Sequence, residues 1–272
     1  MAECYTLEQH LARARDIQVL RLPGVTVATI QLDLLHVVDK GCACYLMGSV
    51  LFQVIQHEGL QGNLHQRVEY VWYCIQQIYD ELQTPRQSRL PQLNFSMVCS
   101  SEARQPSSYP ELGQCKAAHL RHLVSAVAVL LRRFDLGTEV SQHRRRCVER
   151  MRQFYDVAYA CDVVPTSEQA DELLLATHTC ILHYSWLAHH FAQNGMLLYL
   201  LVPKFHYWYH AAQQSRWCSP RHSATCTSED FVGRVAAIAG AVIKGRGPTK
   251  VGAAVVRNYR AAIEVRCHRR LL

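Results

Sequence analysis

The chain has 272 residues, of which 49% are hydrophobic and 19% charged, a composition that excludes a disordered or low-complexity protein. Its 13 glycines and 9 prolines are too few for a protein built from many short strands and turns, so we expect helices to dominate. We expect no membrane span and no secretory signal, because long uncharged apolar runs and a basic, then apolar, N-terminus are missing. Twelve scattered cysteines without a C-x-x-C pair indicate reduced thiols of an intracellular protein.

The positive charge is concentrated at the C-terminal end. From Lys244 onward, eight basic residues are opposed only by Glu264, so this segment carries an excess equal to the whole formal net charge of +7. Such a block is typical of segments that bind phosphates or anionic surfaces, although a solvated basic helix without a partner has the same composition. The candidate nucleic-acid-binding residues are Lys244, Arg246, Lys250, Arg257, Arg260, Arg266, Arg269 and Arg270.

In the first third of the chain, helical spacing is interrupted by one strand candidate. Residues 3–17 have the spacing of a helix, which Pro23 and Gly24 end. Residues 25–32 are β-branched and partly alternating, which predicts a strand. After Asp33 the apolar residues fall at three- and four-residue steps up to Val54, and Asn63 is a suitable N-cap for a helix to about residue 82.

A proline-rich segment, residues 83–113, divides the chain. We interpret it as a long loop, with a short strand near residues 93–98. Beyond it the pattern predicts six helices. They are expected at residues 115–134, 138–161, 167–192, 204–214, 228–243 and 251–268, with Gly137, either Thr166 or Ser167, and Ser228 among their boundary residues.

Three polar groups are candidates for chemistry. Asp33 and His36 lie three residues apart where the strand candidate gives way to helix. They are suited to metal binding, to orienting a phosphate or to acid–base work, or to a structural cap with a hydrogen-bonded histidine. His206 and His210 share one helix face and, together with Cys218 and Cys226, form an alternative zinc set.

The third group is Glu229 with Gly233, at the start of a predicted helix. A carboxylate there is also an ordinary helix-capping group. A glycine within a helix is unfavourable by about 1 kcal/mol relative to alanine, so Gly233 suggests a close approach of another backbone.

The order and flanks of these groups resemble those of eukaryotic DDE transposases of the CACTA type. Residues 32–41 (LDLLHVVDKG) resemble their D-x-M-H-x-x-x-x-G segment, with Leu35 in place of methionine. Residues 203–210 (PKFHYWYH) resemble K-x-H-x-x-x-H. Glu229 and Gly233 resemble F-E-x-x-x-G, with Ser228 in place of phenylalanine.

The resemblance implies a ribonuclease-H-like core with a helical insertion. Residues 1–60 and 196–272 would form part of the core and residues 61–195 the insertion, giving a multi-helix bundle with a small β element. Glu229 would be the third catalytic acid, with Asp33 and His36 as an accessory pair, and Mg²⁺ the metal of a complete site.

The family's first two catalytic aspartates precede the D-x-x-H segment, and here only Asp16 precedes Asp33. A lone carboxylate cannot hold two hard cations. We therefore expect a catalytically incomplete, transposase-derived protein that binds DNA in the nucleus. The alternative is a non-enzymatic helical module that binds RNA or an acidic protein.

Overall fold

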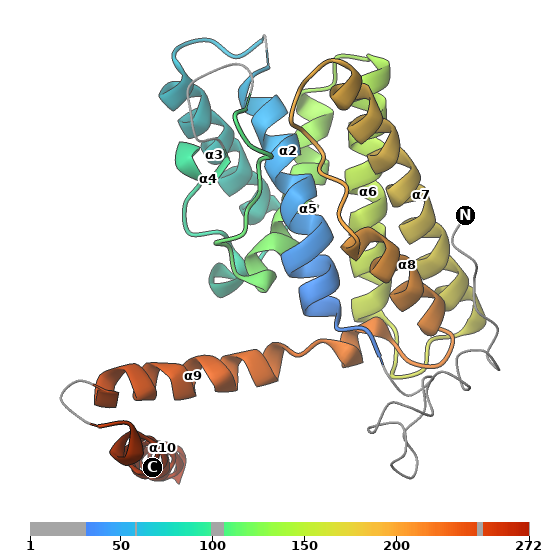
Figure 1. Ribbon diagram of the computed structural model, residues 1–272. Helices are drawn as coiled ribbons and strands as arrows, with labels where there is room; N and C mark the ends of the chain where they lie inside the picture. Colours follow the sequence, from blue (N-terminus) through green and yellow to red (C-terminus); the bar gives the residue numbers. More distant parts are fainter. Residues whose placement is uncertain (1–30, 58, 99–105, 244–246, 272) are drawn as a thin grey trace. The chain divides into compact units, whose positions relative to one another are not determined.

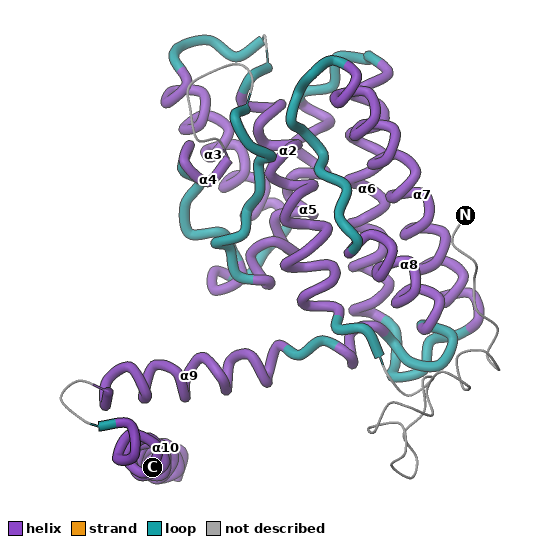
Figure 2. Tube along the Cα trace, viewed as in Figure 1, coloured by secondary structure: helices purple, strands orange, loops and turns teal. Residues whose placement is uncertain are grey.

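The computed structural model describes residues 31–57, 59–98, 106–243 and 247–271. Within these ranges every regular element is a helix and none is a strand, which confirms the prediction of a mainly helical protein (Figures 1 and 2). The helix predicted for residues 3–17 and the strand predicted for 25–32 lie outside the described residues, except for residues 31 and 32, which belong to no strand. The strand predicted near 93–98 is wrong, because Phe95–Val98 forms the short helix α4.

The chain divides into two units, the first ending at Ala224 and the second beginning at Thr225. The elements of the first unit, besides α4, are the π-helix η3 (Leu35–Cys42), α2 (Ala43–Ile55), α3 (Leu64–Glu81), the 3-10 turn η4 (Arg86–Ser88), α5 (Ala117–Arg133), α6 (Glu139–Ala160), α7 (Ser167–Gln193), α8 (Lys204–Gln214) and the 3-10 turn η5 (Pro220–Ser223). The most extensive helix pair is α6 with α7, which run side by side in Figure 1.

Helix α2 is the central helix of the first unit. It packs against α3, α4, α5 and α6, and eleven of its thirteen residues are buried. A helix that is apolar on every side belongs in a core, because any exposed face would leave apolar surface in water. Residues 34–60 and 198–212 of the predicted core part and residues of the predicted insertion (61–195) therefore share one hydrophobic core, to which α2 and α5 both contribute. The ribonuclease-H-like division itself stays a prediction.

Several helix boundaries follow the local sequence signals. Asn63 and Thr166 each form a capping box, and the Thr138 hydroxyl accepts a hydrogen bond from the Ser141 backbone N–H. Gly137 precedes α6 with φ +68°, a backbone conformation that favours glycine. These four predicted boundary residues are confirmed.

The segment before α5 crosses the central helix at close range. A Cβ atom added to Gly48 would lie 2.6 Å from the carbonyl carbon of Pro110 and 2.7 Å from the backbone nitrogen of Glu111. The Lys40 ammonium fixes the same segment by donating to the carbonyl oxygens of Gly113 and Cys115, both at 2.6 Å. Glycine at position 48 therefore allows a backbone-to-helix contact that any side chain would block.

The continuous helical segment Leu35–Ile55, formed by η3 and α2, is the one part of the described chain that is long and apolar enough to cross a membrane. However, 83% of its most apolar window is buried inside the protein, as in the core helix of a bundle. The expected lack of a membrane span stays a prediction.

The second unit consists of α9 (Cys226–Ile243) and α10 (Pro248–Leu271), which pack against each other. The rings of Phe231 and Tyr259 meet edge to face at 5.5 Å, and Val242 and Ala254 are buried. Two predictions are wrong here. Ser228 lies inside α9 and does not cap it, and within the described second unit no atom outside the same helix turn lies within 4 Å of a Cβ added at Gly233, so this glycine serves no close approach there.

Replacing Gly233 with alanine is therefore expected to stabilise the second unit. The added methyl group meets open space, while alanine favours the helix by about 1 kcal/mol over glycine. Circular dichroism of the intact protein, followed during denaturant unfolding, should show an unchanged or higher midpoint. A loss of helix stability in Gly233→Ala would show that another part of the chain packs on this residue.

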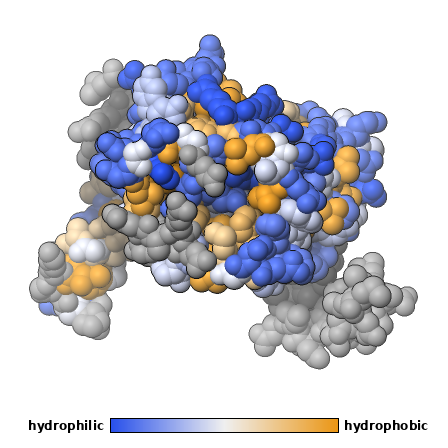
Figure 3. Space-filling model, turned by 90° about the horizontal axis from the view of Figure 1, so that it is seen from above, coloured by the Kyte–Doolittle hydropathy of each residue, from blue (hydrophilic) through white to orange (hydrophobic). Residues whose placement is uncertain are grey.

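The view from above shows one face of the molecule, on which apolar patches alternate with hydrophilic side chains (Figure 3). This face therefore offers no single continuous apolar surface.

Candidate functional site

Two of the three segments that resemble transposase motifs pack against each other. The π-helix η3 and α8 run in opposite directions along one another. At one end a Cβ at Gly41 would meet the Lys204 side chain at 2.6 Å, and the Lys204 ammonium donates to the Lys40 carbonyl oxygen at 3.3 Å. At the other end the Leu32 backbone N–H donates to Gln214 Oε1 at 3.4 Å. The pairing therefore extends over the whole length of both segments.

Asp33 and His36 form the pair that their spacing predicts. His36 Nδ1 donates to Asp33 Oδ2, and Asp33 Oδ1 accepts the backbone N–H of Leu35 at 3.0 Å. The carboxylate thus caps the start of the helix and holds the imidazole, which is half exposed. Both carboxylate oxygens have structural partners, which matches the capping interpretation.

A carboxyl group that the sequence analysis did not single out is the most perturbed acid near this pairing. Asp39 is fully buried in η3, and its Oδ1 accepts a 2.6 Å hydrogen bond from the Tyr155 hydroxyl, while Oδ2 has no partner in the described structure. Burial raises the pKa of Asp39 to about 6, against the opposing effects of the Tyr155 hydrogen bond and the Arg121 charge. The one sequence signal was an acid within the apolar run that leads into the central helix.

The second predicted pair is also formed. His206 Nε2 and His210 Nε2 are 2.9 Å apart on α8, and His210 Nδ1 is 3.0 Å from Gln213 Oε1. Cys218 is partly buried and Cys226 is exposed. Among the described residues no three His, Cys, Asp or Glu side chains are grouped closely enough to hold a metal ion. The four-residue zinc set stays a prediction.

Glu229 lies in the first turn of α9, in the second unit, and its side chain is outside the described part of the structure. The predicted meeting of Glu229 with Asp33 therefore stays a prediction. The described residues do not fit Mg²⁺ at Asp33, since this ion needs several oxygen ligands and Asp33 is in no group of three potential metal ligands. No metal-dependent step is derived from them.

The described basic residues of the C-terminal block are exposed. Lys250, Arg257 and Arg260 all reach solvent from α10. Arg266, Arg269 and Arg270 are also in α10, but their side chains, like the whole of Lys244 and Arg246, lie outside the described residues. The exposed cations are thus arranged on a helix that α9 supports.

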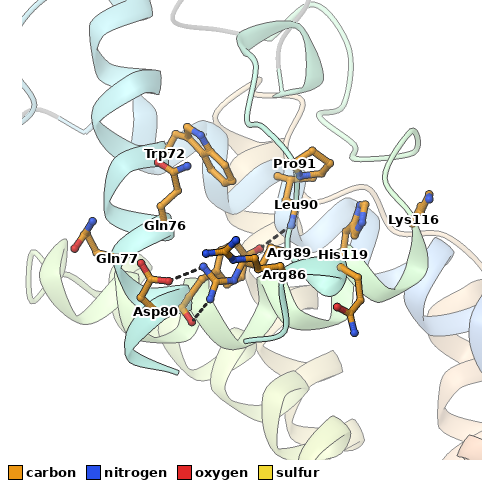
Figure 4. A pocket seen from close by; sticks show the side chains of 12 residues that line it. Trp72, Gln76, Gln77, Asp80, Arg86, Arg89, Leu90, Pro91, Lys116 and His119 are labelled. Carbon is orange, nitrogen blue, oxygen red and sulfur yellow. Dashed lines mark hydrogen bonds and ion pairs between the residues drawn. The ribbon is translucent and has the colours of Figure 1, made fainter. Parts of the chain in front are cut away.

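A pocket of about 690 Å³ lies between α3, the η4 turn and the start of α5 (Figure 4). Arg89, in its wall, is held by Asp80 at 2.6 Å and by the Thr84 carbonyl oxygen at 2.8 Å. Burial, aided by the nearby Lys116 charge, lowers the pKa of His119, so this ring favours its neutral form. The pocket combines polar, cationic and aromatic side chains, and no sequence motif pointed to it.

Compared with known proteins, the chain matches no family model, no curated protein and no solved structure. The functional assignment therefore depends on the charge distribution and on the contacts described above.

Proposed function

We propose that the protein binds duplex DNA through the basic helix α10 and that it derives from a transposase without cutting DNA by itself. The observation that carries the proposal is the concentration of charge. A segment of 29 residues holds an excess equal to the entire net charge, and its described cations are exposed. Binding to phosphates uses such an excess directly, because each phosphate contact releases a condensed counterion. A nuclear location follows from this ligand.

The spacing of the cations supports this ligand. Lys250, Arg257 and Arg260 follow one another at steps of seven and three residues, which keeps them on one side of a helix. They span ten residues, or about 15 Å along α10, which corresponds to about four base-pair steps of B-DNA. A duplex presents several phosphates over that length, whereas a small anion presents one group.

The contacts of Asp33 support the proposal that the protein binds DNA without cutting it. Its two oxygens hold the Leu35 backbone N–H and the His36 ring, so this carboxylate acts as a structural group. The antiparallel packing of η3 on α8 agrees with a transposase ancestry, since it keeps two of the three resembling segments in contact. What remains of such an enzyme is the affinity for DNA.

The test measures DNA binding of the full chain as a function of salt. The variant Lys250→Ala/Arg257→Ala/Arg260→Ala should lose affinity for a duplex. The slope of the logarithm of the association constant against the logarithm of the salt concentration should become smaller by about 2–3, because each lost phosphate contact removes about 0.9. Fluorescence anisotropy with a labelled duplex provides the measurement. The matched control removes three exposed arginines of the first unit, Arg86, Arg132 and Arg146, and should leave the slope unchanged.

Three outcomes would overturn the proposal. Wild-type protein that fails to bind duplex DNA at about 50 mM salt has no phosphate-binding surface, since contacts are strong under that condition. Binding that favours a single-stranded RNA or an acidic peptide over the duplex would instead support a non-enzymatic interaction module. An equal loss in the control variant would show that the first unit contributes as much as α10.

A further inference from the structure

The histidine pair on α8 has an unusual proton arrangement. His206 and His210 approach through the same ring atom, Nε2, at 2.9 Å, with their rings nearly perpendicular at 85°. Two imidazole nitrogens at this distance can hold only one proton between them, because two N–H groups would repel. At least one of the two nitrogens therefore presents its lone pair to the other.

Gln213 indicates which nitrogen that is. The Nδ1 atom of His210 lies 3.0 Å from Gln213 Oε1, an acceptor, so Nδ1 carries the proton of the neutral ring. The Nε2 atom of His210 is then unprotonated, and its lone pair is available to a donor or a metal ion. A histidine that binds a metal has the same arrangement, with one ring N–H held by a carbonyl or carboxylate oxygen and the opposite nitrogen left as the ligand.

The separation of the two nitrogens also fits a particular coordination geometry. Two nitrogens at about 2.05 Å from a metal ion are about 2.9 Å apart at a 90° angle and about 3.3 Å apart at the tetrahedral angle. The observed 2.9 Å therefore matches neighbouring positions of a square-planar or tetragonal ion. Among divalent ions, Cu²⁺ and Ni²⁺ prefer that geometry with nitrogen and oxygen ligands.

We propose that His206 and His210 form a two-histidine chelate for Cu²⁺ or Ni²⁺, with water in the remaining positions. The opposite side of α8 carries buried Phe205, Trp208 and Ala212, which fix the helix against its neighbours. His206 is exposed, so an ion can reach the pair without any opening of the core. When the ion binds, the proton on His206 Nε2 moves to Nδ1 of the same ring, so both rings stay neutral and both Nε2 lone pairs reach the ion. The chelate is independent of Cys218, Cys226 and the DNA-binding helix.

The experiment titrates Ni²⁺, which does not oxidise thiols, into the full-length protein by calorimetry. Each of His206→Ala and His210→Ala should weaken Ni²⁺ binding about 100-fold, because loss of one linked ligand removes the benefit of chelation. Gln213→Ala should weaken it about 10-fold through the lost orientation of His210. The matched control is His65→Ala, an exposed histidine on α3 paired with Glu69 and not with another histidine. It should bind like wild type.

Circular dichroism of the variants confirms that α8 is intact, and the spectrum of bound Cu²⁺ should be tetragonal with nitrogen ligands. Wild-type affinity in either single-histidine variant would overturn the proposal. An equal loss of affinity in Cys218→Ser would also overturn it, in favour of the four-ligand zinc set. Failure of DNA binding would leave the result unaffected, since the two tests use different residues.

Discussion

Replacing Gly48 with alanine is expected to lower the free energy of unfolding by about 3 kcal/mol, the upper end of the cost of overpacking a core. The new methyl group would come within 2.6–2.7 Å of backbone atoms of Pro110 and Glu111, which cannot rotate away as a side chain would. Lys40, on the helical turn that leads into α2, also fixes the segment through hydrogen bonds to the carbonyl oxygens of Gly113 and Cys115. The clash can therefore be relieved only if that segment separates from the central helix.

Thermal unfolding followed by circular dichroism checks this expectation. For a protein of this size, about 3 kcal/mol corresponds to a fall in Tm of about 6–12 °C. Gly233→Ala is the matched control, since it is the same substitution in a helix with open space around the glycine. A Gly48→Ala protein within about 0.5 kcal/mol of wild type, the range of an ordinary surface substitution, would show that the crossing segment is not packed on α2 in solution.

Replacing Asp39 with asparagine is expected to change the pH dependence of stability by about 3 kcal/mol between pH 4 and pH 8. Burial raises the pKa of Asp39 from 3.8 to about 6, so the folded protein binds this proton more tightly than the unfolded chain does. Ionised Asp39 therefore destabilises the fold above pH 6. That destabilisation decreases as the pH falls through 6 and is absent below the pKa that Asp39 has in the unfolded chain. Asparagine carries no charge at either pH.

The relevant quantity is the difference between the Asp39→Asn and wild-type free energies of unfolding at the two pH values. Asparagine keeps the acceptor for Tyr155 but adds an N–H₂ group where Oδ2 has no partner, which costs about 1–3 kcal/mol at every pH. The variant should therefore be less stable than wild type at pH 4 and recover relative to it at pH 8. Urea unfolding at both values provides the measurement.

Asp135→Asn provides a control in which the free energy of unfolding should depend on pH in the opposite direction. The Ser141 hydroxyl, the Gly137 N–H and the Arg145 charge lower the pKa of Asp135, so its contribution is present at neutral pH and is lost as the pH falls through the folded-state pKa. Asp135→Asn should therefore be destabilising at pH 8 and less so in acid. If Asp39→Asn showed the same trend as Asp135→Asn, Asp39 would not be buried in its charged form.

Sequence patterns predicted most helices of the fold because their boundaries are local. The side chains of Asn63, Thr138 and Thr166 bond backbone groups three residues away, and the bounds of α8 agree with the predicted residues 204–214. The π-helix could not be predicted, since its apolar spacing is the same as that of an α-helix, and the close contact of Gly41 with Lys204 joins residues 163 positions apart. The false strand at 93–98 has apolar residues that fit either structure, and its context selected a helix.

The candidate site was predictable where one helix carries both partners. His206 with His210, and Asp33 with His36, are close because three- and four-residue steps bring side chains together on a helix. The burial of Asp39 was not predictable, because it depends on Tyr155 from α6. The pocket beside Arg89 was missed for a similar reason, since its lining comes from three separate elements. The role of Glu229 stays a prediction.

The start and the end of the described first unit are hydrogen-bonded to each other. Leu32 donates its N–H to Gln214 Oε1, and its carbonyl oxygen accepts the Ser223 hydroxyl at 2.8 Å across 191 positions of sequence. Residue 32 and residues 214–223 therefore lie close together. A short linker between these two points would join them covalently. Residues 31–224, joined in this way and opened at the exposed turn around Gly137, are therefore expected to keep the helix pairs of the first unit in a circularly permuted order.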